Sequence, residues 1–213
     1  MKNKIKRNMR IARYVIYRET IIDKSDILWT FLGAFFGIGI IGFISSSHFT
    51  VNDNLFLIGS FGASAVLVYG ATNSPLAQPR NLVGGHLISA IIGVTIHKLI
   101  PGEVWLAAAL AVSIAIVAMQ ITKTTHPPGG ATALIANIGS EKIKALGFGY
   151  VVSPVFTGVV TLLIVALIFN NIPKNRRYPY KRPRNKILRK LFSKRIANTE
   201  KQAENSEKTK VNT

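Results

Sequence analysis

The feature that most limits the fold of this chain is a long stretch, residues 26–173, that is almost free of charge. Residues 25–172 hold only five basic and four acidic side chains. The hydrocarbon core of a bilayer is about 30 Å thick and a helix rises about 1.5 Å per residue, so about 20 apolar residues cross it. Uncharged runs of that length recur within the stretch, which predicts a helical protein embedded in a membrane.

Positive charge is concentrated at the two ends of the chain. Residues 1–24 hold eight Lys and Arg against two acids, and residues 173–213 hold fourteen against three. Lys and Arg beside membrane spans stay in the cytoplasm, so we expect both ends there, an even number of crossings and a place in the plasma membrane. The expected parts are a basic cytoplasmic segment (1–24), a transmembrane domain (25–172) and a basic, largely disordered cytoplasmic tail (173–213).

The apolar segments follow the order long, short, long, and they do so twice. Segment 131–138 would be only about 12 Å long as a helix, which favours four crossings and two buried half-helices. Segment 55–69 could nearly cross, so six crossings stay open. The predicted fold is therefore all-α and polytopic, with two copies of a long-short-long repeat; the long segments are 27–45, 82–100, 105–121 and 146–169.

Two small-residue blocks support an internal duplication. Residues 62–68 read GASAVLV and residues 130–136 read GATALIA, at an offset of 68 positions. Any two apolar helices rich in small residues look alike, but here the order of the elements repeats as well. A duplicated, broken segment in a membrane protein is where a binding site is expected.

The sharpest local signal is the run THPPGGAT at residues 125–132. Residues before proline leave helical geometry and proline starts helices well, so a helix should begin near residue 128. Its free N–H groups at 129–131 and its dipole would favour an anion; a turn at the membrane surface is the alternative. The candidate binding residues are Thr125, His126, Pro127, Pro128, Gly129, Gly130 and Thr132, with Ser60, Gly62 and Ser64 in the corresponding place of the first copy.

A second polar cluster covers residues 73–81 and extends to His86. Arg80 is the only cation between Lys24 and Lys98, so it is either an interfacial anchor or a site residue. A histidine in an apolar helix either packs through hydrogen bonds or contacts a ligand. The candidates here are Gln78, Arg80, Asn81 and His86.

Several classes of activity lack their residues in this sequence. Cysteine is absent, and no Ser-His-Asp constellation, phosphate-binding loop or clustered metal ligands appear. We therefore expect no catalytic residues, no metal, no cofactor and no enzyme. The basic ends should contact anionic lipid headgroups rather than nucleic acid. Small residues at Gly33, Gly37 and Gly42 leave a homo-oligomer open.

Four motifs together resemble the HPP family of integral membrane proteins, over about residues 25–180. They are His126-Pro127-Pro128 with the following GATA, SFGASA at 60–65, SPLAQPRN at 74–81 with GGH at 84–86, and RYP at 177–179. Family members are usually described with four transmembrane helices, and some plastid-type members as nitrite transporters. The resemblance implies transport of a small anion, but it carries no map of binding residues.

The leading hypothesis is a transporter or channel for nitrite or a similar small monovalent anion. The two helix starts would contribute N–H groups, Arg80 a positive charge, and His126 or His86 a hydrogen bond or a co-transported proton. Two alternatives remain open: an intramembrane enzyme that uses His126 or His86, and a scaffold or sensor that binds a partner through its basic tail.

Overall fold

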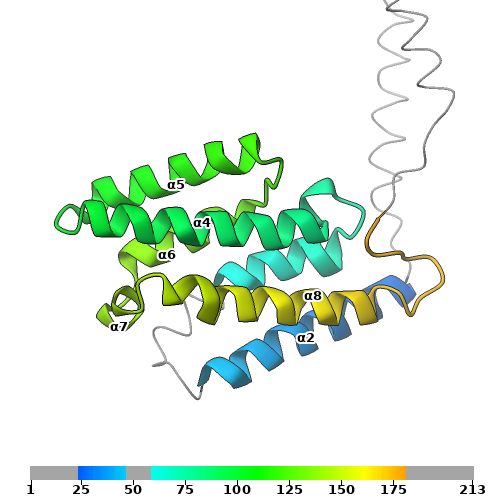
Figure 1. Ribbon diagram of the computed structural model, residues 1–213. Helices are drawn as coiled ribbons and strands as arrows, with labels where there is room; N and C mark the ends of the chain where they lie inside the picture. Colours follow the sequence, from blue (N-terminus) through cyan, green and yellow to red (C-terminus); the bar gives the residue numbers. More distant parts are fainter. Residues whose placement is uncertain (1–23, 47–58, 181–213) are drawn as a thin grey trace, which may run out of the picture. The chain divides into compact units, whose positions relative to one another are not determined.

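The computed structural model describes residues 24–46 and 59–180, and all secondary structure in these ranges is helical (Figure 1). Most of the basic segment 1–24 and of the tail 173–213 lies outside the described residues. Within these two ranges, four helices are long and apolar enough to cross a membrane. They are α2 (Lys24–Ser46), α4 (Pro79–Leu99), α5 (Val104–Ile121) and the continuous run of η3 (Val151–Phe156) and α8 (Thr157–Phe169). The all-helical, polytopic fold is confirmed.

Two apolar helices are about half the length of a span. The first is Gly59–Gly70, whose last turn is η1 (Val66–Gly70), and the second is α6 (Pro127–Ile138). The 12 residues of α6 give a rod of about 18 Å, too short for a hydrocarbon core of about 30 Å. The described residues thus favour four crossings with two half-helices, arranged long, short, long in each copy.

Local sequence explains where several elements begin. Pro79 and Pro127 occupy the first turns of α4 and α6, where proline loses nothing because the N–H there has no helical partner. The hydroxyl of Ser74 accepts from Leu76 N ahead of η2 (Pro75–Ala77), and that of Ser140 accepts from Ile143 N ahead of α7 (Glu141–Ala145). These short elements connect the longer helices.

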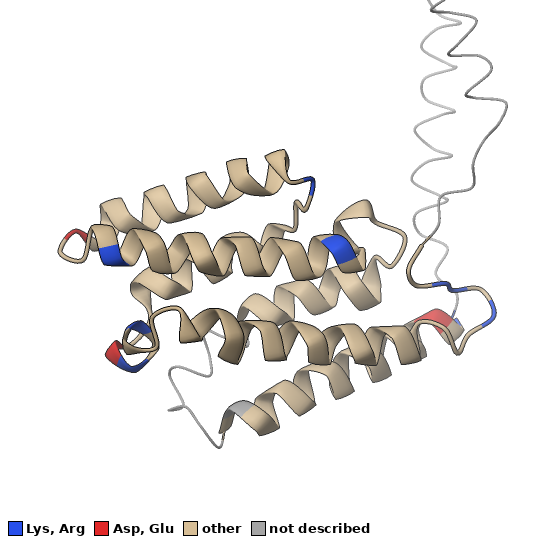
Figure 2. Cartoon of the chain, in the orientation of Figure 1, with Lys and Arg blue, Asp and Glu red and all other residues tan. Residues whose placement is uncertain are grey.

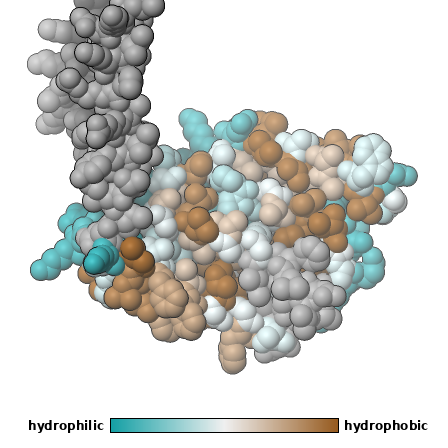
Figure 3. All heavy atoms as spheres, turned by 180° about the vertical axis from the view of Figure 1, so that it is seen from behind, coloured by the Kyte–Doolittle hydropathy of each residue, from teal (hydrophilic) through white to brown (hydrophobic). Residues whose placement is uncertain are grey.

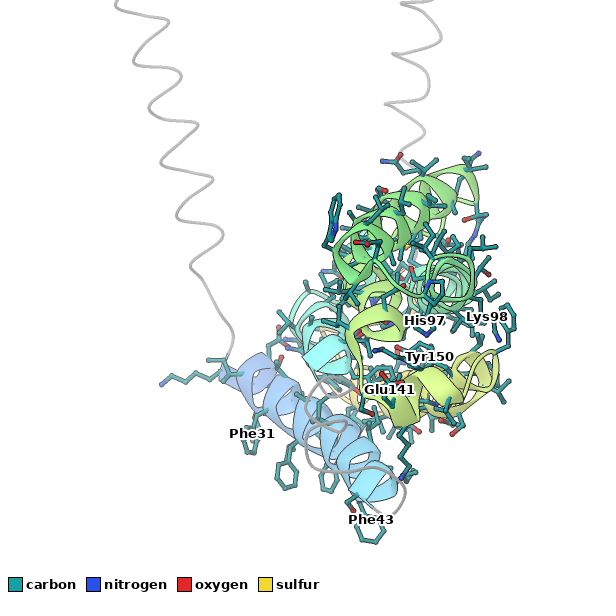
Figure 4. The ribbon with its side chains drawn as sticks, turned by 90° about the vertical axis from the view of Figure 1, so that its left-hand side faces the viewer. Phe31, Phe43, His97, Lys98, Glu141 and Tyr150 are labelled. Atoms are coloured by element: carbon teal, nitrogen blue, oxygen red, sulfur yellow. The ribbon has the colours of Figure 1, made fainter. Side chains whose placement is uncertain are left out.

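The helix α4 lies at the centre of the bundle. It packs against α5 and α6 on one side and against η3 and α8 on the other, while α2 packs against α8 and η1 (Figure 1). Phe31 and Phe43 of α2 point away from the bundle (Figure 4) and are 61% and 77% exposed. Large apolar side chains exposed on a helix of this length are expected to face lipid.

The charged residues of the described ranges lie near the ends of the helices (Figure 2). Strongly hydrophilic side chains lie toward the margins of the face drawn in Figure 3. This distribution is the one expected of a bundle whose middle crosses hydrocarbon and whose ends meet water.

Three contacts place four helix ends together at one end of the bundle, which we call the Arg176 end. Arg176 pairs with Asp26 at the start of α2, and Arg80 at the start of α4 donates to Thr122 O just after α5. Tyr180 N donates to Gln78 Oε1, which brings the segment after α8 to the start of α4. His97, Lys98 and Glu141 lie at the opposite end (Figure 4).

The two copies of the repeat therefore run in opposite directions. α2 and α4 lead away from the Arg176 end, whereas α5 and α8 lead toward it. This is the inverted arrangement found in many transporters, whose sites lie where the broken helices of the two copies meet.

Candidate functional site

The first turns of the two half-helices lie against each other. The Ser60 hydroxyl lies 3.3 Å from Pro128 O and 2.8 Å from Thr132 Oγ1. Ser60, Thr132 and His126 are buried, and the side chain of His126 has no exposed surface. The His-Pro-Pro turn thus lies inside the protein and beside its counterpart in the first copy.

Two histidines extend this contact into a continuous set of hydrogen bonds. Ser64 Oγ lies 2.8 Å from His86 Nε2 and 2.9 Å from His126 Nε2. His86 Nδ1 lies 2.7 Å from Thr132 Oγ1, which closes the connection to Ser60. We call these five buried residues the hydroxyl–imidazole network: Ser60, Thr132, His86, Ser64 and His126.

The network lies between three helices that approach closely through glycines. A Cβ added to Gly85 of α4 would lie 2.5 Å from His126 Cβ, and one added to Gly129 of α6 would lie 2.8 Å from Ser89 Oγ. Real Cβ atoms do not approach so closely, so these two positions need glycine. Gly62 differs because a Cβ there would meet nothing within 4 Å.

The first turn of α6 offers few backbone N–H groups to a ligand. Pro127 and Pro128 have none, and Gly129 N donates to His126 O at 2.8 Å. The polar chemistry where the half-helices meet therefore comes mainly from side chains. The sequence predicted free N–H groups at residues 129–131, and the N–H of Gly129 is not one of them.

A separate groove of about 490 Å³ runs between α5 and α6. Its lining is mostly apolar, so it suits hydrocarbon better than a charged ligand. Three candidate residues border this groove and are not members of the hydroxyl–imidazole network: Thr125, Pro127 and Gly130.

The candidates of the second polar cluster hold loops together at the Arg176 end. Gln78 Nε2 donates to Thr72 O and Ser74 O. Asn81 Nδ2 donates to Thr125 O at 2.8 Å, and the exposed Arg80 donates to Thr122 O at 2.7 Å. His86 alone from this cluster belongs to the network.

Sequence reasoning missed two groups that complete the network. His126 Nδ1 lies 2.8 Å from the carbonyl oxygen of Leu76, and the hydroxyl of Tyr150 donates to Thr132 O at 3.1 Å. Tyr150 points into the bundle (Figure 4). A backbone carbonyl leaves no mark in a sequence, whereas a tyrosine in an otherwise apolar run was a usable signal, because its hydroxyl needs a buried partner.

Sequence reasoning also placed Arg176 with the basic tail, yet the structure ties it into the bundle. Its guanidinium contacts Asp26, Thr30 Oγ1 and Tyr69 O. Arginine presents five donors in a fixed plane, so it can join several acceptors at once. The residue therefore fastens the segment after α8 to α2 and to the first half-helix.

In the part of the chain that the structure describes, no group of three or more His, Cys, Asp or Glu side chains is placed to bind an ion. Both ring nitrogens of His86 and of His126 lie within hydrogen-bond distance of protein oxygens. Each of these four ring nitrogens therefore already has a hydrogen-bond partner within the protein.

Within the described residues, four candidate spans and two inverted half-helices that meet at a buried polar network define a polytopic membrane protein. The protein belongs to the HPP transmembrane region family, whose match covers residues 19–179.

Two relatives are described as transmembrane proteins of Dictyostelium discoideum. One is 46% identical over 160 residues, which is 74% of this chain and 51% of the relative. The other is 42% identical over 165 residues, or 76% of this chain and 58% of the relative. The chain therefore spans little more than half the length of these proteins. No solved structure shows significant similarity to it.

Proposed function

We propose that this protein moves a small monovalent anion, nitrite or one like it, across the plasma membrane, with both of its ends in the cytoplasm. The observation that carries the proposal is the contact between Ser60 and Thr132, where two inverted half-helices meet. Irregular backbone at membrane depth is tolerated only where it is buried in protein or lines a water-filled cavity. In transporters built from repeats, the binding site lies where the broken helices of the two repeats meet.

The network supplies groups that can bind an anion. Ser60, Ser64 and Thr132 each have a hydroxyl donor, and each histidine has at least one ring N–H. Their present partners are other members of the network or nearby carbonyls. An anion between the half-helices would exchange these bonds for charge-assisted ones, which are about twice as strong.

Arg80 supports the proposal from the surface. Its side chain is exposed at the Arg176 end, where it leaves most of its donors to solvent. A positive charge beside a pathway raises the local concentration of anions. In this proposal Arg80 attracts the anion at the entrance, and the network binds it deeper in the bundle.

The test is nitrite uptake into proteoliposomes that contain the parent protein, Arg80→Gln or His126→Ala. We expect Arg80→Gln to slow uptake, more so at low ionic strength, and His126→Ala to abolish it. Lys98→Gln is the matched control, because it removes one exposed positive charge from the opposite end of the bundle (Figure 4). Parental uptake by both variants would refute the site, and no uptake by the parent above that of empty liposomes would refute nitrite transport.

An intramembrane enzyme is the second candidate, because Ser64 lies between two imidazoles in the arrangement of a nucleophile and its base. His126, however, bonds to the Leu76 carbonyl rather than to a carboxylate. This candidate predicts that an activated phosphonate probe labels Ser64 and fails to label Ser64→Ala. Labelling in the absence of nitrite uptake would favour the enzyme.

The scaffold alternative relies on the basic tail. In our proposal the tail contacts anionic headgroups, and residues 183–213 are not needed for flux. A protein truncated after residue 182 should therefore take up nitrite at the parental rate in proteoliposomes. A loss of flux with unchanged insertion into the liposomes would contradict this division of roles.

A further inference from the structure

The hydrogen bonds of the network have a defined direction. The carbonyl of Leu76 can only accept, so His126 Nδ1 must donate to it. When His126 carries a single ring proton, its Nε2 has none and must accept from the Ser64 hydroxyl. The Ser64 hydroxyl could instead donate to Ser60 O, at the longer distance of 3.2 Å. That would leave His126 Nε2 as a buried acceptor without a donor, at a cost of about 1–3 kcal/mol, so donation to His126 is favoured.

The same reasoning continues through the second imidazole. The only proton of Ser64 is used on His126, so Ser64 must accept from His86 Nε2. With one ring proton, His86 then accepts at Nδ1 from the Thr132 hydroxyl. Thr132 in turn accepts from Ser60. The two histidines therefore have opposite tautomers, with the proton on Nδ1 of His126 and on Nε2 of His86.

The hydrogen bonds between the members of the network can also all run in the opposite direction, with each donor becoming an acceptor. Ser60 has a second acceptor, the Pro128 carbonyl at 3.3 Å. If Ser60 turns to it, Thr132 can donate to Ser60, His86 Nδ1 to Thr132, and Ser64 to His86 Nε2. His126 then carries protons on both ring nitrogens, donating to Ser64 and to Leu76 O. Every buried donor has an acceptor in this state too.

We propose that the hydroxyl–imidazole network is a proton relay, which takes up a proton at Ser60 and holds it on His126 while His86 only changes its tautomer. A hydronium ion breaks one of its O–H bonds and leaves as water, its proton forms a new O–H bond at Ser60, and the former Ser60 proton passes to Thr132. The Thr132 proton forms an N–H bond at His86 Nδ1, and the His86 Nε2 proton passes to Ser64. The Ser64 proton forms the Nε2–H bond of His126, so one proton enters and one charge appears.

The positive charge that appears is carried by the network residues themselves. In the described part of the chain, the hydrogen bonds of its five members involve no Asp, Glu, Lys or Arg. Tyr150, which directly precedes η3, reaches the Thr132 carbonyl, and Tyr178 reaches Ala77 O beside Leu76. Arg80 and Lys123 lie at the Arg176 end, where both are exposed. Gly59, next to Ser60, is exposed.

The relay itself does not depend on which solute is moved; only its coupling to anion movement rests on the proposed function. The experiment is ¹⁵N NMR of histidine-labelled full-length protein in lipid nanodiscs without any anion substrate. The chain has four histidines, so the variant His48→Gln/His97→Gln leaves signals from His86 and His126 alone. Near neutral pH we expect an unprotonated Nε2 on His126 and an unprotonated Nδ1 on His86.

The second measurement follows the same ¹⁵N signals as the pH is lowered. We expect His126 to gain a proton on Nε2, and His86 to exchange its Nε2 proton for one on Nδ1 in the same titration. Equal tautomers on the two rings at neutral pH would overturn the relay, as would a second proton on His86 in place of the tautomer change. Because no flux is measured, failure here leaves the proposed transport intact, and failure of nitrite uptake leaves these tautomers unchanged.

Variants of Ser64 separate a relay from simple packing. Ser64→Ala should leave His126 with its proton on Nδ1 and should uncouple the His86 tautomer from the titration of His126. Ser64→Thr retains the hydroxyl and should restore the coupling. Ser89→Ala is the matched control, because it removes a buried hydroxyl of α4 that lies outside the network and contacts Met119 Sδ. Coupling that persists in Ser64→Ala would refute the relay; should that variant fail to fold, the tautomers of the parent still decide.

Discussion

The hydroxyl of Ser60 lies 3.3 Å from the carbonyl oxygen of Pro128, which follows it by 68 positions. The two small-residue blocks of the sequence are offset by the same 68 positions. Equivalent positions of the two copies are therefore in contact. The same is true near the axis of a two-fold symmetric interface, where one patch packs against its own copy. This contact is one of the points at which the two half-helices meet.

Close approach of α4 to α6 makes Gly93 a sensitive position. A Cβ there would lie 2.6 Å from Ala133 O and 2.9 Å from Ala133 Cα. Backbone atoms cannot move aside as a flexible side chain can, so Gly93→Ala should lower the free energy of unfolding by about 1–3 kcal/mol. Unfolding in mixed detergent measures it. Gly39→Ala on α2 is the control, since a Cβ there meets nothing within 4 Å; equal stability of both variants would contradict the prediction.

The network should lose both stability and transport when Thr132 loses its hydroxyl. Thr132→Val keeps the shape but leaves Ser60 and His86 Nδ1 without their partner, at a cost of about 1–3 kcal/mol for an unpaired buried group. Thr132→Ser should retain both stability and nitrite uptake. Thr95→Val is the control, because its exposed hydroxyl bonds only to Ile91 O of its own helix. Parental uptake by Thr132→Val would remove Thr132 from the site.

Arg176 should stabilise the Arg176 end more than any neighbouring basic residue. Its Nε lies 2.8 Å from Asp26 Oδ1, its Nη2 donates to Thr30 Oγ1 at 2.7 Å, and its side chain is only 9% exposed. Arg176→Gln should lower the free energy of unfolding by about 1.5–3 kcal/mol, the range for hydrogen bonds to charged groups. Arg177→Gln, an exposed neighbour, should change it by less than about 0.5 kcal/mol. A similar loss in both variants would show a general charge effect.

Tyr178 should make stability fall at alkaline pH. Burial raises the pKa of its hydroxyl above the usual range, and that hydroxyl donates to Ala77 O at 2.7 Å. The unfolded tyrosine loses its proton near pH 10, so this contribution is complete below about pH 10 and declines as the pH rises further.

Tyr178→Phe should isolate that contribution. We expect it to cost about 1 kcal/mol near pH 7, one neutral hydrogen bond, and to show a shallower decline above about pH 10 than the parent. Unfolding curves at several alkaline pH values measure the difference. Parallel curves for the variant and the parent would mean that the Tyr178 hydroxyl does not contribute.

Much of the architecture could be predicted from the sequence because it depends on local properties. The lengths of the uncharged runs determine which helices can cross a bilayer. Pro127 and Pro128 determine where α6 begins, since proline cannot sit inside a helix without losing a hydrogen bond. The repeated order of long and short segments likewise indicated two copies and a meeting of half-helices. His86 and His126 could be selected as candidates from their residue type and surroundings.

Only the tertiary structure decided which polar residues share a site. It joined Ser60, Ser64, His86, His126 and Thr132, which are up to 72 positions apart, and it left Gln78, Arg80 and Asn81 to bind loop carbonyls. The reason is that side chains of similar chemistry are distinguished by the partners that helix packing brings to them. The carbonyl of Leu76 determines the direction of the hydrogen bonds in the network. Because it is a backbone group, the residue type at position 76 could not have predicted this role.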